Sequence, residues 1–278
     1  MPYLLHRQRS WKLLLILASS LTVPAVALAQ QAAGAGPTIY QRYAPVNLTG
    51  TWVSVVTEDY AQRMLAPVKG DFSSLPLNTA AQKAANGWDP ARDLAAGEAC
   101  KSYAAPALLR IPGRLKINWQ DGGNTLRIET DAGQQTRLLQ FAGSEPNGEA
   151  GWQGYSRASW EYAGGFDPAR AGSGGDSAGA ASRRGRSASP PTPKGGALKV
   201  VTTHLKPGYL RKNGVPYSKD ALLTEYLNLH ADPYGTDWMI VTTIVHDPAY
   251  LVVDYITSTN FKRELDDANW RPRPCTVQ

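Results

Sequence analysis

The sequence is poor in the residues that bind metal ions, with two cysteines and four histidines among 278 residues. It contains no His-x-His pair, no His-Glu-x-x-His motif and no cysteine cluster, so no metal site is predicted. The Gly-x-Ser-x-Gly motif of serine hydrolases, the phosphate-binding loop, the dinucleotide fingerprint and the kinase motifs are also missing. These absences exclude most cofactor-dependent enzymes, and no cofactor is expected. They leave open a lyase, isomerase or hydrolase that works without one.

Long apolar runs are missing beyond residue 30, so no stable membrane span is predicted. Residues 1–29 have the parts of a cleavable signal peptide: a positively charged start, an apolar run over residues 13–21 and the small-x-small site Ala27-Leu28-Ala29. An uncleaved N-terminal anchor is the alternative. We therefore expect a periplasmic or extracellular protein.

The formal net charge of +6 lies in the expected signal peptide and in residues 164–196, and the remainder of the chain is electrically balanced. A domain that binds nucleic acid concentrates basic residues on its folded surface, so no nucleic-acid partner is predicted. Residues 164–196 are rich in Gly, Ala, Ser, Pro and Arg, which predicts a disordered insert. A tolerated surface insertion is favoured over a functional tail. The sequence does not indicate an oligomeric state.

The two cysteines, Cys100 and Cys275, are expected to form a disulfide if the protein is exported. That bond would hold the C-terminus against the body of the protein. Two free thiols or a catalytic thiol are the alternatives.

Alternating apolar and polar residues, punctuated by turn sequences, predict about nine short strands. Two helices are expected over residues 79–86 and 89–101, after the first strand. We expect residues 30–46 to be a leader and residues 47–278 to form a single mainly β domain, a sandwich or an up-and-down barrel. The expected strands cover residues 48–56, 115–120, 126–131, 136–141, 155–162, 198–205, 222–229, 238–245 and 256–262.

The first expected strand contains Gly50-Thr51-Trp52, which resembles the Gly-x-Trp motif of lipocalin-type barrels. The resemblance implies an antiparallel lipocalin-like barrel of about 8–10 strands, with the Trp plugging its closed end. The chain also resembles a family of secreted, largely uncharacterised bacterial proteins, a likeness that implies no particular chemistry. The motifs that carry it are Thr57-Glu58-Asp59, Lys69-Gly70-Asp71, Trp88-Asp89-Pro90, Trp152-Gln153-Gly154-Tyr155-Ser156 and the segment from Pro207 to Ser218.

The segment from Pro207 to Ser218 is the first candidate binding region. Arg211 could bind a carboxylate or phenolate through two hydrogen bonds, and Tyr209 and Tyr217 offer aromatic faces and hydroxyl groups. Asn213 is expected at a turn in a left-handed conformation. A loop over the mouth of a barrel is the functional interpretation, and a long connection tied down by its Arg and Tyr residues is the alternative.

Carboxylates supply the candidate general bases. Glu58 and Asp59 follow the first strand, and because neighbouring strand residues point to opposite faces, only one of them is expected to face a cavity. Arg63 is expected beside that base as a substrate-binding residue. A structural salt bridge at the barrel rim is the alternative. Glu225 lies within a strand and would need a partner if it pointed inward.

A histidine completes the candidate site. His204 ends a strand just before the Pro207–Ser218 segment, where an imidazole could transfer a proton beneath the loop. A surface or hydrogen-bonded histidine is the alternative. Arg127, Glu129, Asp131 and Arg137 are expected to form cross-strand ion pairs on one polar face, and a polar barrel lumen is the other interpretation.

The sequence therefore favours an exported, cofactor-free lyase or hydrolase that acts on a small aromatic or hydrophobic compound in a barrel cavity. Cleavage of an aryl ether is one example, since it needs only a base and a group that stabilises a phenolate. A non-catalytic binding protein for a small hydrophobic ligand is the alternative, and an envelope interaction protein is a third.

Overall fold

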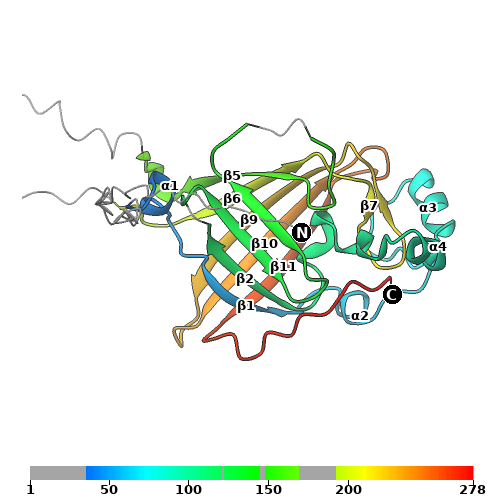
Figure 1. Cartoon of the computed structure of the whole chain (residues 1–278), viewed down its shortest axis with the longest axis horizontal. Helices are drawn as coiled ribbons and strands as arrows, with labels where there is room; N and C mark the ends of the chain where they lie inside the picture. The colour runs from blue at the N-terminus through cyan, green and yellow to red at the C-terminus, as the bar shows by residue number, and fades with distance from the viewer. Residues whose placement is uncertain (1–35, 121, 145–147, 169–191, 278) are drawn as a thin grey trace, which may run out of the picture. The chain divides into compact units, whose positions relative to one another are not determined.

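The computed structural model describes residues 36–277, apart from residues 121, 145–147 and 169–191. The expected signal peptide and most of the expected insert lie outside these residues. The described chain forms a closed barrel of nine strands with short helices (Figure 1). The predicted fold class, a mainly β barrel with a few short helices, is confirmed.

The nine barrel strands match the nine strands expected from the sequence, with bounds that differ by a few residues. They are β1 (Gly50–Val55), β2 (Arg114–Trp119), β3 (Thr125–Thr130), β4 (Thr136–Gln140), β5 (Tyr155–Tyr162), β6 (Gly196–Thr203), β9 (Leu222–Ala231), β10 (Asp237–His246) and β11 (Tyr255–Glu264). The other elements are α1 (Ile39–Arg42), α2 (Tyr60–Met64), α3 (Thr79–Asn86), α4 (Pro90–Ala95), η1 (Ala99–Tyr103), α5 (Ala105–Leu108), η2 (Ala163–Gly165) and the paired two-residue strands β7 (Gly208–Tyr209) and β8 (Pro216–Tyr217).

Each barrel strand pairs with its neighbours along the chain, and β11 closes the barrel on β1. Eight of the nine pairings are antiparallel, and β4 and β5 run parallel, with Leu139 opposite Ser156. A closed barrel with an odd number of strands cannot alternate direction throughout, so one parallel pair is a geometric necessity. The expectation of a purely antiparallel barrel was wrong in this one pairing.

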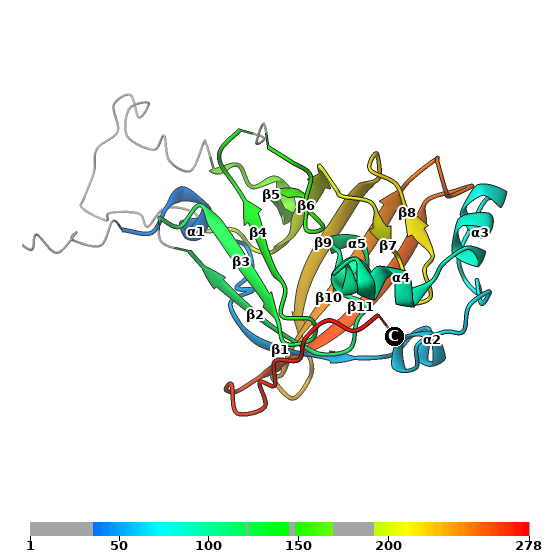
Figure 2. The same ribbon diagram turned by 45° about the vertical axis from the view of Figure 1, so that its right-hand side comes forward.

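The barrel has two distinct ends (Figures 1 and 2). The helix α1 lies at one of them, which we call the α1 end. The other, which we call the helical end, carries α2, α3, α4 and the β7–β8 hairpin in both views. The connections after β1, β6 and β10 all emerge there, because β1, β6 and β10 run in the same direction.

Side-chain caps set the first residue of two helices at the helical end, and a glycine sets where the second helix stops. The side chain of Asn78 accepts a hydrogen bond from the N–H of Ala81 and so caps α3. Asp89 caps α4, and Pro90 occupies its first turn, as expected. The expected helix over residues 89–101 is nevertheless interrupted, because Gly97 adopts a φ of +70° and the chain resumes as η1.

Apolar side chains fill the barrel interior nearest α1. Trp52 on β1 is fully buried, and its Nε1 donates to the carbonyl of Leu48 at 2.9 Å. The guanidinium of Arg263, at the end of β11, lies 4.2 Å from the centre of the Trp52 ring. Tyr40 and Val46 pack against the same core. The described part of the expected leader therefore belongs to the barrel domain.

The disulfide between Cys100 and Cys275 is confirmed, with Cα atoms 5.1 Å apart. It joins η1 to the C-terminal segment, which runs back from the end of β11 to the helical end (Figure 1). None of the helices that the structure describes is both long enough and apolar enough to cross a bilayer.

Candidate functional site

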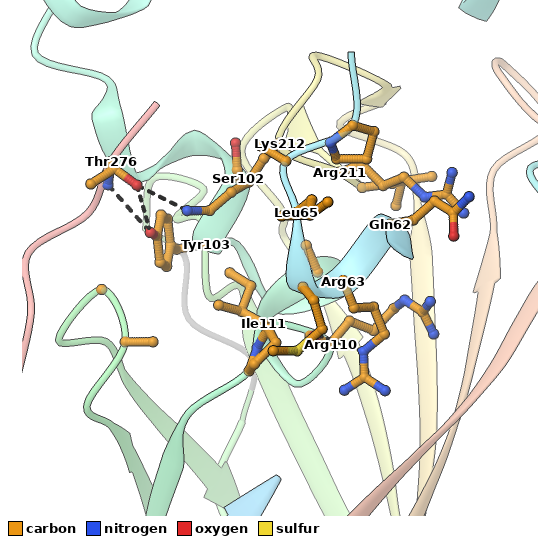
Figure 3. Close-up of a pocket in the computed structure, with 18 of the residues that line it drawn as sticks. Gln62, Arg63, Leu65, Ser102, Tyr103, Arg110, Ile111, Arg211, Lys212 and Thr276 are labelled. Atoms are coloured by element: carbon orange, nitrogen blue, oxygen red, sulfur yellow. Dashed lines mark hydrogen bonds between the residues drawn. The ribbon is translucent and has the colours of Figure 1, made fainter. Parts of the chain in front are cut away.

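A cavity of about 470 Å³ opens at the helical end of the barrel (Figure 3). Its walls come from α2 and the residues that follow it, from η1 and the segment after it, from the β7–β8 turn and from the C-terminal segment. Leu65 and Ile111 contribute apolar surface. Among the described residues no Asp, Glu or His lines it. Its charged lining residues are all cationic: Arg63, Arg110, Arg211, Lys212 and Arg273.

Glu58 and Asp59, the expected general bases, are both held by Arg110. Its Nη1 donates to Glu58 Oε1 at 2.9 Å, and its Nη2 donates to Asp59 Oδ2 at 2.6 Å. The N–H of Ser258 donates to the same oxygen of Glu58 at 3.0 Å. Because β1 ends at Val55, the two carboxylates do not lie on a strand, and the expectation that they face opposite sides was wrong. The two carboxylates form a structural salt bridge at the barrel rim with Arg110, which is the alternative stated in the sequence analysis.

Arg63 on α2 is buried beside this ion-pair cluster. Its Nε donates to the carbonyl of Arg110 at 2.9 Å, but neither Nη1 nor Nη2 has a hydrogen-bond partner among the described residues. Burial and, after it, the neighbouring charge of Arg110 lower the pKa of Arg63 to about 10, against the opposing effect of Glu58 and Asp59. The guanidinium is therefore still charged at neutral pH and lacks a direct counter-ion.

Arg211 is buried in the turn between β7 and β8. Its Nη1 donates to the carbonyl of Ser73 at 2.6 Å, and its Nη2 lies 3.7 Å from Asp59 Oδ2. Figure 3 shows the guanidinium groups of Arg63, Arg110 and Arg211 on the side of the cavity opposite Tyr103. The structure thus brings Arg211 together with Glu58, Asp59 and Arg63, as the sequence suggested.

Asn213 lies in the same turn and has a structural role. Its Nδ2 donates to the carbonyls of Val68 and Asp71, at 3.2 and 2.8 Å. The expected left-handed conformation belongs to Gly214 instead, with a φ of +80°. A side chain at that position would meet the ring of Trp88, so the turn requires glycine.

Tyr209 and Tyr217 do not line the cavity, contrary to expectation. The hydroxyl of Tyr209 donates to Asp93 Oδ2 at 2.7 Å, and burial together with this bond raises the pKa of Tyr209 to about 12. Tyr217 is fully buried and donates to the carbonyl of Lys206 at 2.7 Å, and burial raises the pKa of Tyr217. Both phenols therefore hold the β7–β8 hairpin in place, which is the alternative that the sequence left open.

His204 also lies away from the site. Its side chain is exposed, its Nδ1 lies 3.0 Å from the hydroxyl of Thr203, and it is not among the residues that line the cavity. The residue has a φ of +54°, which turns the chain after β6. The expected proton transfer beneath the loop has no support from this position.

Glu225 points into the barrel and is paired there with Arg137, both side chains being 1% exposed. Arg137 Nη1 and Nη2 donate to the two carboxylate oxygens at 3.0 and 2.7 Å, and Nη2 also contacts the hydroxyls of Ser156 and Thr202 at 3.2 Å. The expectation that Arg137 shares an outer polar face with Arg127 was therefore wrong. Part of the lumen is polar, as the alternative held, and Glu225 is not a free base.

Two functional features escaped the sequence analysis. Arg110, which organises the carboxylates, follows α5 in a stretch with no motif or periodicity to single it out. Tyr103 lines the cavity together with Lys212 and Thr276, and the Lys212 amine lies 4.8 Å from the centre of its ring. Burial raises the pKa of Tyr103, but hydrogen bonds with Lys212 and Thr276 outweigh that effect and leave it lowered.

The cationic side chains that line the cavity suit the binding of an apolar or negatively charged molecule, and no Asp, Glu or His among the described lining residues offers a free base. Each carboxylate near the cavity is already paired with Arg110. The described residues contain no group of three or more His, Cys, Asp or Glu that could hold a metal ion. Comparisons with protein-family models, with curated proteins and with solved structures gave no match, so the site is interpreted from its own geometry.

Proposed function

We propose that this protein binds a small, largely apolar molecule, such as an aromatic compound, in the cavity at the helical end. The observation that supports this most is the lining: apolar side chains and cationic residues surround a space of about 470 Å³ with no acid or histidine among the described residues. This volume falls within the usual range for small-molecule sites, roughly 300–1,000 Å³.

Binding is better supported than catalysis by the same contacts. A lyase or hydrolase without cofactor needs a general base within reach of its substrate. Glu58 and Asp59 are held by Arg110, Glu225 is held by Arg137, and His204 is exposed elsewhere. We therefore favour the non-catalytic binding protein over the lyase or hydrolase.

The expected export of this protein agrees with the role of a carrier or sensor outside the cytoplasm. The disulfide between Cys100 and Cys275 is typical of proteins that fold in an oxidising compartment. It agrees with the signal peptide expected over residues 1–29, so we propose that the ligand is met in the periplasm or outside the cell.

A neutral aromatic probe, 2-naphthamide, tests the proposal by fluorescence titration and calorimetry. Leu65→Asp places a charge in the apolar wall, and we expect it to weaken binding about tenfold, since losing one apolar contact is worth roughly 1–2 kcal/mol. Leu94→Asp is the matched control, because Leu94 is similarly exposed, at 62% against 71%, but does not line the cavity. The proposal fails if the wild type does not bind the probe or if both variants bind like the wild type.

Mass spectrometry after incubation of the protein with a panel of aromatic compounds separates binding from turnover. Aromatic compounds that bind and are recovered unchanged support the carrier. Recovery of cleaved products would restore the enzymatic alternative.

A further inference from the structure

Three of the four arginines that line the cavity, Arg63, Arg110 and Arg211, are buried, and their access to counter-ions differs. Arg110 donates one hydrogen bond to each of the two carboxylates, Glu58 and Asp59. Arg211 lies 3.7 Å from Asp59 and also interacts with the partly exposed Asp71. Arg63 is left with two terminal nitrogens that touch neither solvent nor any acceptor among the described residues.

A buried guanidinium without an acceptor is unfavourable. Leaving a buried charged group unpaired costs several kcal/mol, and arginine does not readily lose its proton to avoid that cost. The charge of Arg63 persists at neutral pH, because burial and Arg110 lower its pKa only to about 10. The fold therefore keeps a cation in a position where only an added anion or water can satisfy it.

A second unpartnered donor lies beside Arg63. Tyr255, the first residue of β11, is buried and faces the barrel interior, and its hydroxyl has no partner among the described residues. It is close enough to Arg63 to interact with its charge, and its ring lies 5.9 Å from the Arg110 guanidinium. The next inward residue of β11, Thr257, also has an unpartnered hydroxyl.

These donors match one chemical group. A carboxylate has two oxygens spaced to accept from both terminal nitrogens of one guanidinium, and a further lone pair for a hydroxyl. A single negative charge is the complement of the one buried guanidinium at the cavity that lacks a direct counter-ion among the described residues. Arg63 also lines the apolar cavity, but its two terminal nitrogens and the Tyr255 hydroxyl are covered from solvent. No hydrogen bond holds these terminal nitrogens in place, so a small shift of this wall can bring Arg63 to the acid group of a molecule in the cavity.

We infer that the ligand of this cavity is an organic monocarboxylate, whose apolar body occupies the cavity and whose carboxylate is anchored by Arg63, with Tyr255 as a second donor. This inference rests on the proposed function, since it names the class of ligand for the same cavity. It adds that affinity and selectivity depend on one guanidinium.

A matched pair of probes tests the anchor. The probes are 2-naphthoate, which carries a carboxylate, and 2-naphthamide, which has the same size and no charge. We expect the wild-type protein to bind 2-naphthoate at least about tenfold more tightly, because hydrogen bonds to charged groups are worth roughly 1.5–3 kcal/mol. Arg63→Met should weaken 2-naphthoate about 30-fold and leave 2-naphthamide within about twofold.

Controls separate the anchor from general charge effects. Arg92→Met removes an exposed arginine from α4, another short helix of the same end, and should leave both affinities unchanged. Tyr255→Phe should weaken 2-naphthoate by about threefold to tenfold with no effect on 2-naphthamide. Arg63→Lys keeps the charge but not the paired donors, so it should retain only part of the preference.

The outcomes are distinguishable. Equal wild-type affinities for the two probes, or a preference that survives in Arg63→Met, overturn the carboxylate anchor and leave the binding cavity standing. Binding of neither probe overturns both the anchor and the proposed function. If Arg63→Met does not fold, the wild-type affinity ratio and the Tyr255→Phe variant still decide the question.

Discussion

The ion pair between Arg137 and Glu225 offers the sharpest test of the barrel interior. Both side chains are 1% exposed, and the guanidinium binds both carboxylate oxygens, at 3.0 and 2.7 Å. Arg137→Met removes the cation but keeps a long, unbranched side chain that fills part of the same space. It leaves Glu225 buried without its partner and takes a donor from the hydroxyls of Ser156 and Thr202.

The expected loss is large because the remaining charge is uncompensated. Breaking a buried pair by removing one partner typically costs about 3–5 kcal/mol, and we expect Arg137→Met to lower the free energy of unfolding by that amount. The double variant Arg137→Met with Glu225→Leu removes both charges and should recover most of the loss. The two changes should therefore couple by about 2 kcal/mol or more in a double-mutant cycle.

Urea unfolding followed by tryptophan fluorescence measures these differences. Arg127→Met is the matched control, because Arg127 pairs with Glu129 at 2.9 Å on the solvent side of β3 and is 43% exposed. We expect that change to cost less than about 1 kcal/mol, as exposed ion pairs usually do. Two results would refute the buried pair. One is a loss of less than about 1 kcal/mol in the free energy of unfolding of Arg137→Met. The other is a double variant that is less stable than both Arg137→Met and Glu225→Leu alone.

Three further predictions follow from other parts of the fold. Cys275→Ser should lower stability by up to roughly 5 kcal/mol in thermal or urea unfolding and weaken 2-naphthoate, because the disulfide holds a segment that forms a cavity wall. Gly214→Ala should lower the melting temperature much more than Gly235→Ala: both residues have a φ of +80°, but only at Gly214 does an added Cβ meet Trp88. Hydrogen bonds from Lys101 and Lys206 lower the pKa of Glu98. The ionised carboxylate therefore stabilises the fold above pH 4.5, the ordinary pKa, and this stabilisation is lost as the pH falls through the lowered pKa. Glu98→Gln should then melt below the wild type at pH 7, and the difference in melting temperature should shrink as the pH falls below 4.5, whereas a pH-independent difference would contradict this assignment.

The barrel itself was predictable from the sequence because period-two alternation reports which side of a strand is buried. The strand bounds of β2 and β3 follow from residues such as Ile117 and Ile128, which the structure buries. The parallel pairing of β4 and β5 was not predictable, because it depends on the number of strands that close the barrel. The interruption at Gly97 shows that one glycine overrides a helical pattern over the surrounding residues.

The candidate site was only partly predictable. Glu58, Asp59, Arg63 and Arg211 do meet, but the residue that decides their chemistry, Arg110, comes from a segment without a pattern. Its effect is to occupy the carboxylates, which sequence alone cannot reveal. The tyrosines were misassigned because the hydrogen bonds that hold them, to Asp93 and to a backbone carbonyl, link distant parts of the chain.

The inward position of Arg137 agrees with the polar lumen that the sequence left open as the alternative. Arg137 shares its parity along β4 with Leu139 and Phe141, both of which are buried in the core. Glu225 likewise shares its parity with Leu223 and Leu227 on β9. The alternation along these two strands therefore places Arg137 and Glu225 inside the barrel, where the structure pairs them.

The most direct test of this account is the ratio of dissociation constants for 2-naphthamide and 2-naphthoate, measured at pH 7 for the wild type and for Arg63→Met. We predict a ratio of at least about ten in the wild type that falls to about one in the variant. A ratio near one in the wild type, or one that is unchanged in the variant, contradicts the claim that Arg63 anchors an anionic ligand in this cavity.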